Sequence, residues 1–119
     1  MSPRARILVV EDEALVAFAL EEMLSDFGYD VVGPAPNVQA ALKLVGDEKI
    51  DAAILDVNLG GETVEPVAEA LAAVGAPFVF TTGYSSASAL PPAFKDRPSL
   101  NKPYQPEALR EAVARLLGD

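Results

Sequence analysis

Cysteine and histidine are both absent from this sequence of 119 residues. Without cysteine the chain can form no disulfide, and it has no thiolate to serve as nucleophile or metal ligand. Without histidine it has no Ser-His-Asp triad, no histidine-ligated zinc and no phosphohistidine of its own. The absences exclude these classes of enzyme and metal site, and the lack of cysteine is compatible with a reducing compartment.

Basic residues and long apolar runs are also scarce. Nine Lys and Arg against 18 Asp and Glu give a net charge of −9, which disfavours binding to nucleic acid or to an anionic membrane surface. No apolar run approaches the roughly 20 residues of a membrane span. The first apolar run is too short for a signal peptide, because Glu11, Asp12 and Glu13 interrupt it. We therefore expect a cytoplasmic protein without nucleic-acid or membrane partners.

Half of the residues are apolar, and they alternate between short continuous runs and longer runs with helical spacing. This alternation predicts one α/β domain over residues 1–119, a flavodoxin-like doubly wound parallel sheet of five strands in the order 2-1-3-4-5. Helices are expected on both faces of the sheet. The expected strands lie at 7–10, 31–32, 52–55, 78–80 and, more weakly, 99–101.

Local signals mark where the helices begin and end. Asn37 is a good N-cap, and Gly28, Gly46 and Gly75 are expected just beyond the ends of three helices. Residues 84–96, which include two consecutive prolines, predict a short or irregular fourth helix. The last helix ends close to residue 119, so we expect no output domain on this chain.

Polar residues follow the predicted strands at their carboxyl ends. Glu11 and Asp12 follow the first strand, Asp56 the third, Thr82 the fourth and Lys102 the fifth. In a parallel sheet all of these residues lie at one edge, where ligands bind at the point of strand-order reversal. Each alone could be an ordinary turn or cap residue, but together, in this order, they predict a site.

Acidic side chains brought together at this edge would repel one another. Two unit charges about 4 Å apart cost ~1 kcal/mol in water and ~4 kcal/mol at an effective dielectric constant of 20. A cation offsets this repulsion, and oxygen ligands without histidine or cysteine suit Mg²⁺. Lys102 could supply a second positive charge, to a phosphoryl oxygen or to Asp56 itself.

With these features the sequence resembles the receiver domains of bacterial two-component response regulators over essentially its whole length. The resemblance rests on ILVVEDE at 7–13, on Asp56 after AAIL, on Thr82-Gly83 and on Lys102-Pro103. It also extends to a single-domain subgroup known by the motif FAT GUY, which is similar to PFVFTTGY at 77–84, with Thr81 in place of alanine.

The resemblance implies a role for each matching residue. Glu11, Asp12, Asp56 and the backbone carbonyl of Asn58 would bind Mg²⁺. Asp56 would be the phosphoacceptor, Thr82 the switch hydroxyl and Lys102 the lysine that contacts the phosphoryl group. The partner would be a sensor histidine kinase or a histidine phosphotransfer protein. A cis peptide bond before Pro103 is also implied.

Two positions depart from the pattern of most receivers. Ser99 stands where an aromatic residue usually turns inward on phosphorylation, and Pro91-Pro92 falls within the usual fourth helix. We hypothesise that Tyr84 replaces the missing aromatic switch; the alternative is that Tyr84 only covers the site and slows attack by water.

The predicted function is that of a signalling phosphoacceptor that is not a free-standing enzyme. The main alternative is a pseudo-receiver that binds proteins without phosphorylation. A phosphatase of the haloacid dehalogenase type is disfavoured, because Asn58 stands where it needs a second Asp. A flavodoxin-like cofactor binder is disfavoured, because Glu11, Asp12 and Glu13 follow the first strand where a phosphate-binding loop would be needed.

Overall fold

The computed structural model describes residues 4–82, 92–94, 99–101 and 105–118. Within them lie seven strands, four α-helices and one short 3₁₀ helix, in the order β1 (Arg6–Val10), α1 (Ala14–Asp26), β2 (Asp30–Ala35), α2 (Val38–Asp47), β3 (Ala52–Asp56), β4 (Asn58–Leu59), β5 (Glu62–Thr63), α3 (Glu65–Ala73), β6 (Phe78–Thr82), η2 (Pro92–Phe94), β7 (Ser99–Asn101) and α4 (Pro106–Leu116).

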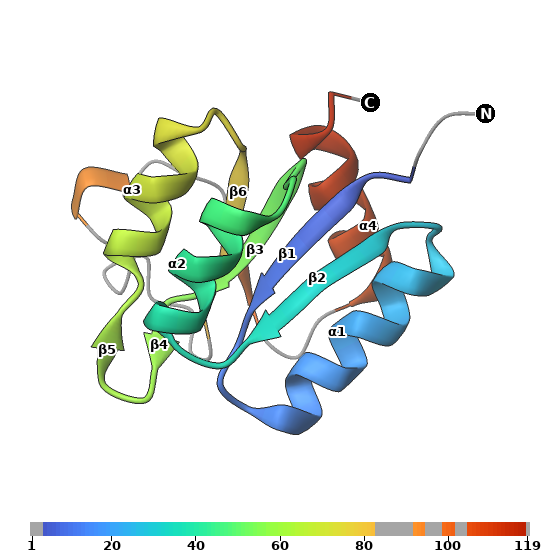
Figure 1. Ribbon diagram of the computed structural model, residues 1–119. Coiled ribbons are helices and arrows are strands. Elements are labelled where there is room, and N and C mark those ends of the chain that lie inside the picture. The colour runs from blue at the N-terminus through green and yellow to red at the C-terminus, as the bar shows by residue number, and fades with distance from the viewer. Residues whose placement is uncertain (1–3, 83–91, 95–98, 102–104, 119) are drawn as a thin grey trace.

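The main sheet has five parallel strands in the order β2-β1-β3-β6-β7, which confirms the predicted topology. Every residue of β3 and β6 is buried, as expected for central strands covered on both faces. In Figure 1, α1 and α2 cover opposite faces of this sheet, and the carboxyl ends of β1 and β2 point to the edge where α1 begins.

Side-chain alternation divides the core into two layers. Leu8, Leu55 and Phe80 face α2 and α3, and Ile7, Ile54 and Val79 face α1 and α4. On the first layer, Phe94 of η2 packs edge-on against Phe78, with ring centroids 5.5 Å apart. The two layers hold the strands rigidly from both sides, so the carboxyl edge is presented by a fixed scaffold.

Several of the predicted helix boundaries are confirmed. Oδ1 of Asn37 accepts a hydrogen bond from the backbone N–H of Ala40 at 2.8 Å, which is the expected N-cap of α2. Gly28 and Gly75 follow α1 and α3 with φ of 96° and 76°. The expectation for Gly46 was wrong: α2 continues to Asp47, and Gly46 lies within its last turn.

The weak strand and the irregular helix both have counterparts in the structure. Ser99–Asn101 forms β7, because pairing with β6 supplies the hydrogen bonds that its composition alone does not favour. Between β6 and β7 the described residues form only the short 3₁₀ helix η2. The remaining predictions for this stretch concern residues outside the described part of the chain.

A small second sheet, which was not predicted from the sequence, lies directly after β3. β4 and β5 form an antiparallel hairpin, connected by Gly60 and Gly61. Both glycines have positive φ, 61° and 94°, which is the geometry that a two-residue hairpin turn needs. Glu62 accepts a hydrogen bond from the backbone N–H of Val38 at 3.2 Å, so the hairpin is tied to the start of α2.

Candidate functional site

The carboxyl edge of the sheet brings three acidic residues together. Carboxylate oxygens of Glu11, Asp12 and Asp56 all lie within 4.8 Å of one another. Glu11 and Asp56 are each only 2% exposed, whereas Asp12 is exposed. The prediction that these residues converge, although they lie far apart in the sequence, is therefore confirmed.

Backbone hydrogen bonds fix Glu11 at the end of β1. Its N–H donates to the carbonyl of Ala35 at 3.0 Å, which joins it to the end of β2. Its Oε2 accepts from the backbone N–H of Glu13 at 3.1 Å. The loop after β1 therefore turns the Glu11 carboxylate back over the sheet edge, toward the neighbouring acids.

Asp56 is held in a similar way at the end of the central strand β3. Its Oδ1 accepts a hydrogen bond from the backbone N–H of Asn58 at 3.0 Å. The N–H of Val57 donates to the carbonyl of Thr81 at 3.1 Å, which extends the pairing of β3 with β6 past the acidic residue. The carboxylate is thus positioned by its own loop and by the pairing of β3 with β6.

The donor set of this cluster fits a hard divalent cation. All three side chains offer oxygen, and two of them are buried, so their charges are poorly solvated without a counter-ion. Mg²⁺ is bound in proteins by one or two carboxylates together with water and phosphate oxygens. One exposed and two buried carboxylates provide such a set.

The other predicted site residues are placed only in part. Thr82 is buried at the end of β6 and is the register partner of Asn101 in β7. Asn58 begins β4 directly beside the acids. Lys102, Tyr84 and the bond before Pro103 lie outside the described residues.

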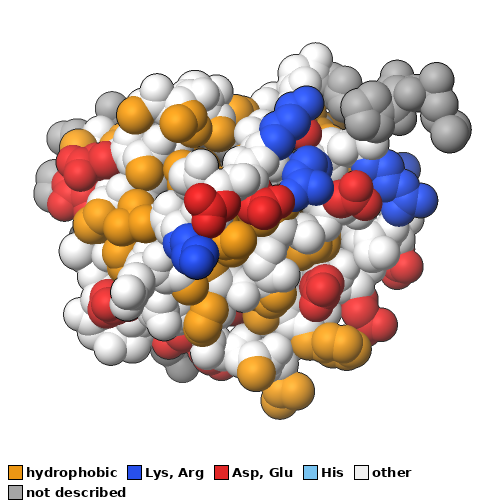
Figure 2. All heavy atoms as spheres, viewed as in Figure 1, with side chains coloured by type: hydrophobic (Ala, Val, Ile, Leu, Met, Phe, Trp, Pro, Cys, Tyr) orange, Lys and Arg blue, Asp and Glu red, His pale blue; other side chains and the backbone are white. Residues whose placement is uncertain are grey.

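A shallow hollow of about 360 Å³ opens beside the acids. It is lined by two of the clustered acids, by residues of α1 and by two prolines at and just beyond the end of β2: Glu11, Asp12, Ala14, Ala17, Phe18, Glu21, Pro34 and Pro36. Phe18 is 58% exposed, and the nearby Leu15 is 85% exposed. Figure 2 shows apolar side chains at the surface in the region of α1. An apolar surface therefore adjoins the acidic site.

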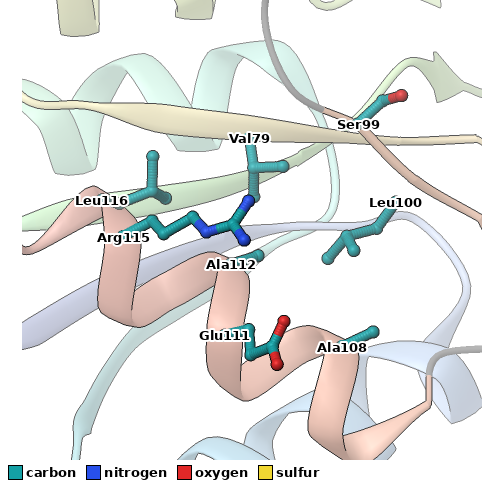
Figure 3. Close-up of a pocket in the computed structure, with 8 residues that line it drawn as sticks. All are labelled: Val79, Ser99, Leu100, Ala108, Glu111, Ala112, Arg115 and Leu116. Carbon is teal, nitrogen blue, oxygen red and sulfur yellow. The ribbon is translucent and has the colours of Figure 1, made fainter. Parts of the chain in front are cut away.

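A second hollow, of about 410 Å³, lies between β7 and α4, and none of the three clustered acids lines it (Figure 3). In Figure 3, Val79 and Leu100 extend from the strands toward the helix, whereas Ser99 points away from it. This hollow was not predicted from the sequence. Ala108 and Ala112, two small residues four apart on one helix, are the signal that could have revealed it.

Comparison with known proteins identifies the family. The family model for the response regulator receiver domain matches residues 7–114. The chain belongs to this family. A receiver domain is a signalling module, and its family works generally with kinases or phosphotransfer proteins. Among the described residues, no helix has the length and apolarity to cross a membrane.

Individual relatives agree with this assignment. The solution structure of SdrG from Sphingomonas melonis Fr1 is 50% identical, with a TM-score of 0.85 over 98% of this chain and 99% of that one. A structure described as the BeF3-activated conformation of SdrG is equally similar in sequence, with a TM-score of 0.81.

Two curated regulators are more distant relatives. The transcriptional regulatory protein PdtaR of Mycobacterium tuberculosis is 37% identical over 67% of this chain. The phyllosphere-induced regulator PhyR of Methylorubrum extorquens is 30% identical over 93% of it. The matches span 40% of PdtaR and 43% of PhyR, so this receiver domain corresponds to less than half of either protein.

Proposed function

We propose that this receiver domain is a phosphoacceptor, which takes a phosphoryl group from a partner phosphohistidine onto Asp56. The observation that carries the proposal is the convergence of Glu11 and Asp12 on Asp56, within 4.8 Å, at the carboxyl edge of the sheet. Such a cluster costs stability through charge repulsion unless a cation binds there. A structural role alone does not account for three acids in this arrangement.

In the proposed site, Mg²⁺ is held by Glu11, Asp12, Asp56 and the backbone carbonyl of Asn58. When bound, it neutralises charge on the transferring phosphoryl oxygens. A carboxylate oxygen of Asp56 forms the new bond to phosphorus as the phosphorus–nitrogen bond of the donor breaks, and the imidazole keeps the electron pair. The hydrogen bond from Asn58 to Oδ1 of Asp56 orients the carboxylate for this attack.

The remaining predicted residues complete the proposed response. Lys102 contacts the phosphoryl group, and Thr82 donates a hydrogen bond to one of its oxygens. Thr82 is the last residue of β6, directly before the segment that leads to η2, so a displacement of its side chain would act on that segment. We propose Tyr84, two residues later, as the side chain that reports the change in place of the aromatic residue missing at Ser99.

The apolar surface beside the acids supports a docking role for α1. A phosphohistidine must approach Asp56 at the carboxyl edge of the sheet. The partner protein that carries this phosphohistidine must therefore contact the surface around that edge. The exposed side chains of Leu15 and Phe18 and the adjoining hollow offer this contact. We propose them as the docking surface for a sensor histidine kinase or a histidine phosphotransfer protein.

Labelling by a small phosphodonor tests the function without knowledge of the natural partner. The purified domain is mixed with acetyl phosphate, with and without Mg²⁺, and its mass is measured. We expect a metal-dependent gain of one phosphoryl group in the wild type, no gain in Asp56→Asn, and an undiminished gain in the control Asp47→Asn on the exposed end of α2.

Two results would contradict the proposal. Labelling that persists in Asp56→Asn would place the phosphoryl group on another residue. A wild-type domain that takes no label at saturating Mg²⁺ would favour the alternative, a pseudo-receiver that binds its partners without phosphorylation.

A further inference from the structure

Thr81 carries a hydroxyl group in the interior of the sheet. Its side chain is 0% exposed, and its Oγ1 has no hydrogen-bond partner among the residues that the structure describes. Most buried side-chain polar atoms have a partner, because leaving one without a partner is costly. Valine has nearly the same shape and would avoid this cost, so packing alone does not explain a threonine here.

The strand register places Thr81 next to Asp56. The two residues are register partners on the parallel strands β6 and β3, which lie about 4.8 Å apart. Ile54 and Val79, the register pair two residues earlier, both face α1 and α4. Because side chains alternate along a strand, Asp56 and Thr81 leave the sheet on this same face.

The other lateral neighbour of Thr81 offers no polar side chain. On β7 its register partner is Leu100, which packs into the core beside α4. The buried hydroxyl therefore has an apolar neighbour on one side and the predicted phosphoacceptor on the other. The hydroxyl group without a partner therefore belongs to the residue beside Asp56, whose carboxyl group would be modified in the proposed function.

We propose that the Thr81 hydroxyl donates a hydrogen bond to the phosphorylated Asp56, at the oxygen that bridges to phosphorus. This inference rests on the proposed phosphorylation of Asp56. This hydrogen bond forms only when Asp56 is phosphorylated. The hydroxyl group of Thr81 therefore has no partner among the described residues of the unphosphorylated structure. Rotation of the threonine between staggered conformers is enough to redirect its hydroxyl.

Such a donor shortens the lifetime of the aspartyl phosphate. In hydrolysis, the oxygen of a water molecule bonds to phosphorus, and the bond from phosphorus to the Asp56 oxygen breaks. The electron pair stays on that oxygen, and the proton of the water passes to solvent. Thr81 keeps its own proton, but its hydrogen bond stabilises the negative charge that develops on the departing carboxylate.

The decay of the phosphorylated domain tests this role. Wild type, Thr81→Val and Thr81→Ser are labelled with acetyl phosphate and Mg²⁺, the donor is removed, and the loss of label is followed by mass. We expect Thr81→Val to lose its label about tenfold more slowly, which corresponds to 1.4 kcal/mol. Thr81→Ser keeps the hydroxyl and should decay within about twofold of the wild type.

Stability measurements separate this role from a structural one. Without phosphodonor, Thr81→Val should unfold at a higher temperature than the wild type, because it removes the unmet hydroxyl. Val79→Thr places a hydroxyl two residues earlier on the same face, so it should lower the unfolding temperature and leave the decay unchanged. If valine impairs folding, Thr81→Ala compared with Thr81→Ser provides the same contrast.

The outcomes distinguish this inference from the proposed function. Equal decay in Thr81→Val and the wild type would overturn the role of the hydroxyl while Asp56 remains the phosphoacceptor, and so would a serine variant as slow as the valine variant. Failure of the wild type to take any label would overturn the proposed function, and the role of Thr81 with it.

Discussion

Gly60 lies directly against Asp12, so that a Cβ atom at Gly60 would stand 3.4 Å from Oδ2 of Asp12. The contact brings the turn of the β4–β5 hairpin to the rim of the acidic cluster. The same hairpin contacts the start of α2 through Glu62 and Val38. The hairpin that follows β3 thus connects the acidic cluster to the start of α2.

The two glycines of this turn form a matched pair for a test. Gly60→Ala and Gly61→Ala both place alanine at positive φ, and each should destabilise the domain by about 1 kcal/mol. Only the methyl group at position 60 would contact Asp12, because a Cβ at Gly61 meets nothing within 4 Å. We expect weaker Mg²⁺ binding, measured by calorimetry, in Gly60→Ala alone. Equal binding in the two variants would contradict a role for the turn at the metal site.

The acidic cluster should make stability depend on Mg²⁺. In Asp12→Asn one of three neighbouring charges is lost, so without metal the free energy of unfolding should rise by about 1 kcal/mol at low salt. The same variant should lose most of the stabilisation that millimolar Mg²⁺ gives the wild type. Urea unfolding with and without Mg²⁺ measures both effects. Glu22→Gln, an exposed charge on α1, is the control and should keep the metal response.

A change at Phe18 tests the proposed docking surface separately from the chemistry at Asp56. Phe18→Ala removes a large exposed apolar side chain beside the site, so phosphoryl transfer from a partner phosphohistidine should slow by about tenfold or more. Labelling by acetyl phosphate needs no docking and should be unchanged. Val74, which is 63% exposed at the end of α3, provides the control Val74→Ala. Equal loss in both variants would argue against docking at α1.

Tyr84 lies outside the described residues, and its role as a switch remains a prediction. Tyr84→Ala should leave labelling of Asp56 intact, because the residue follows Thr82 by two positions and supplies no charge to the site. The amide NMR shifts that accompany phosphorylation of the wild type should be lost in the segment after β6. If the variant shows the wild-type response and merely hydrolyses faster, Tyr84 covers the site and does not report its state.

The central strands could be predicted from sequence because their residues carry an unambiguous physical signal. The run at 52–55 is apolar at every position, which is possible only where both faces of a sheet are covered. β7 was harder to predict because three residues around Leu100 depend on pairing with β6. The prediction that α2 ends before Gly46 was wrong because a glycine is tolerated inside the last turn of a helix. The position of a glycine alone therefore does not show where the helix ends.

The acidic cluster could be predicted from the strand order, whereas the hairpin and the buried hydroxyl group near it could not. Once strand order is known, residues after β1 and β3 must lie at one edge, and so Glu11 and Asp56 could be paired in advance. The β4–β5 hairpin could not be foreseen, since two strands of two residues each leave almost no pattern. The unmet hydroxyl of Thr81 depends on register and burial, which only coordinates reveal.

The central position of β3 has a mechanical consequence. Asp56 is the last residue of β3, which pairs with β1 on one side and with β6 on the other, so β3 cannot shift without breaking two ladders at once. At the opposite end of the sheet, Arg6 joins β1 to the residues before β3 through hydrogen bonds to Lys49 and Glu48. We therefore expect a chemical change at Asp56 to act on the rest of the domain through side-chain rotations and loop rearrangements, while the sheet keeps its position.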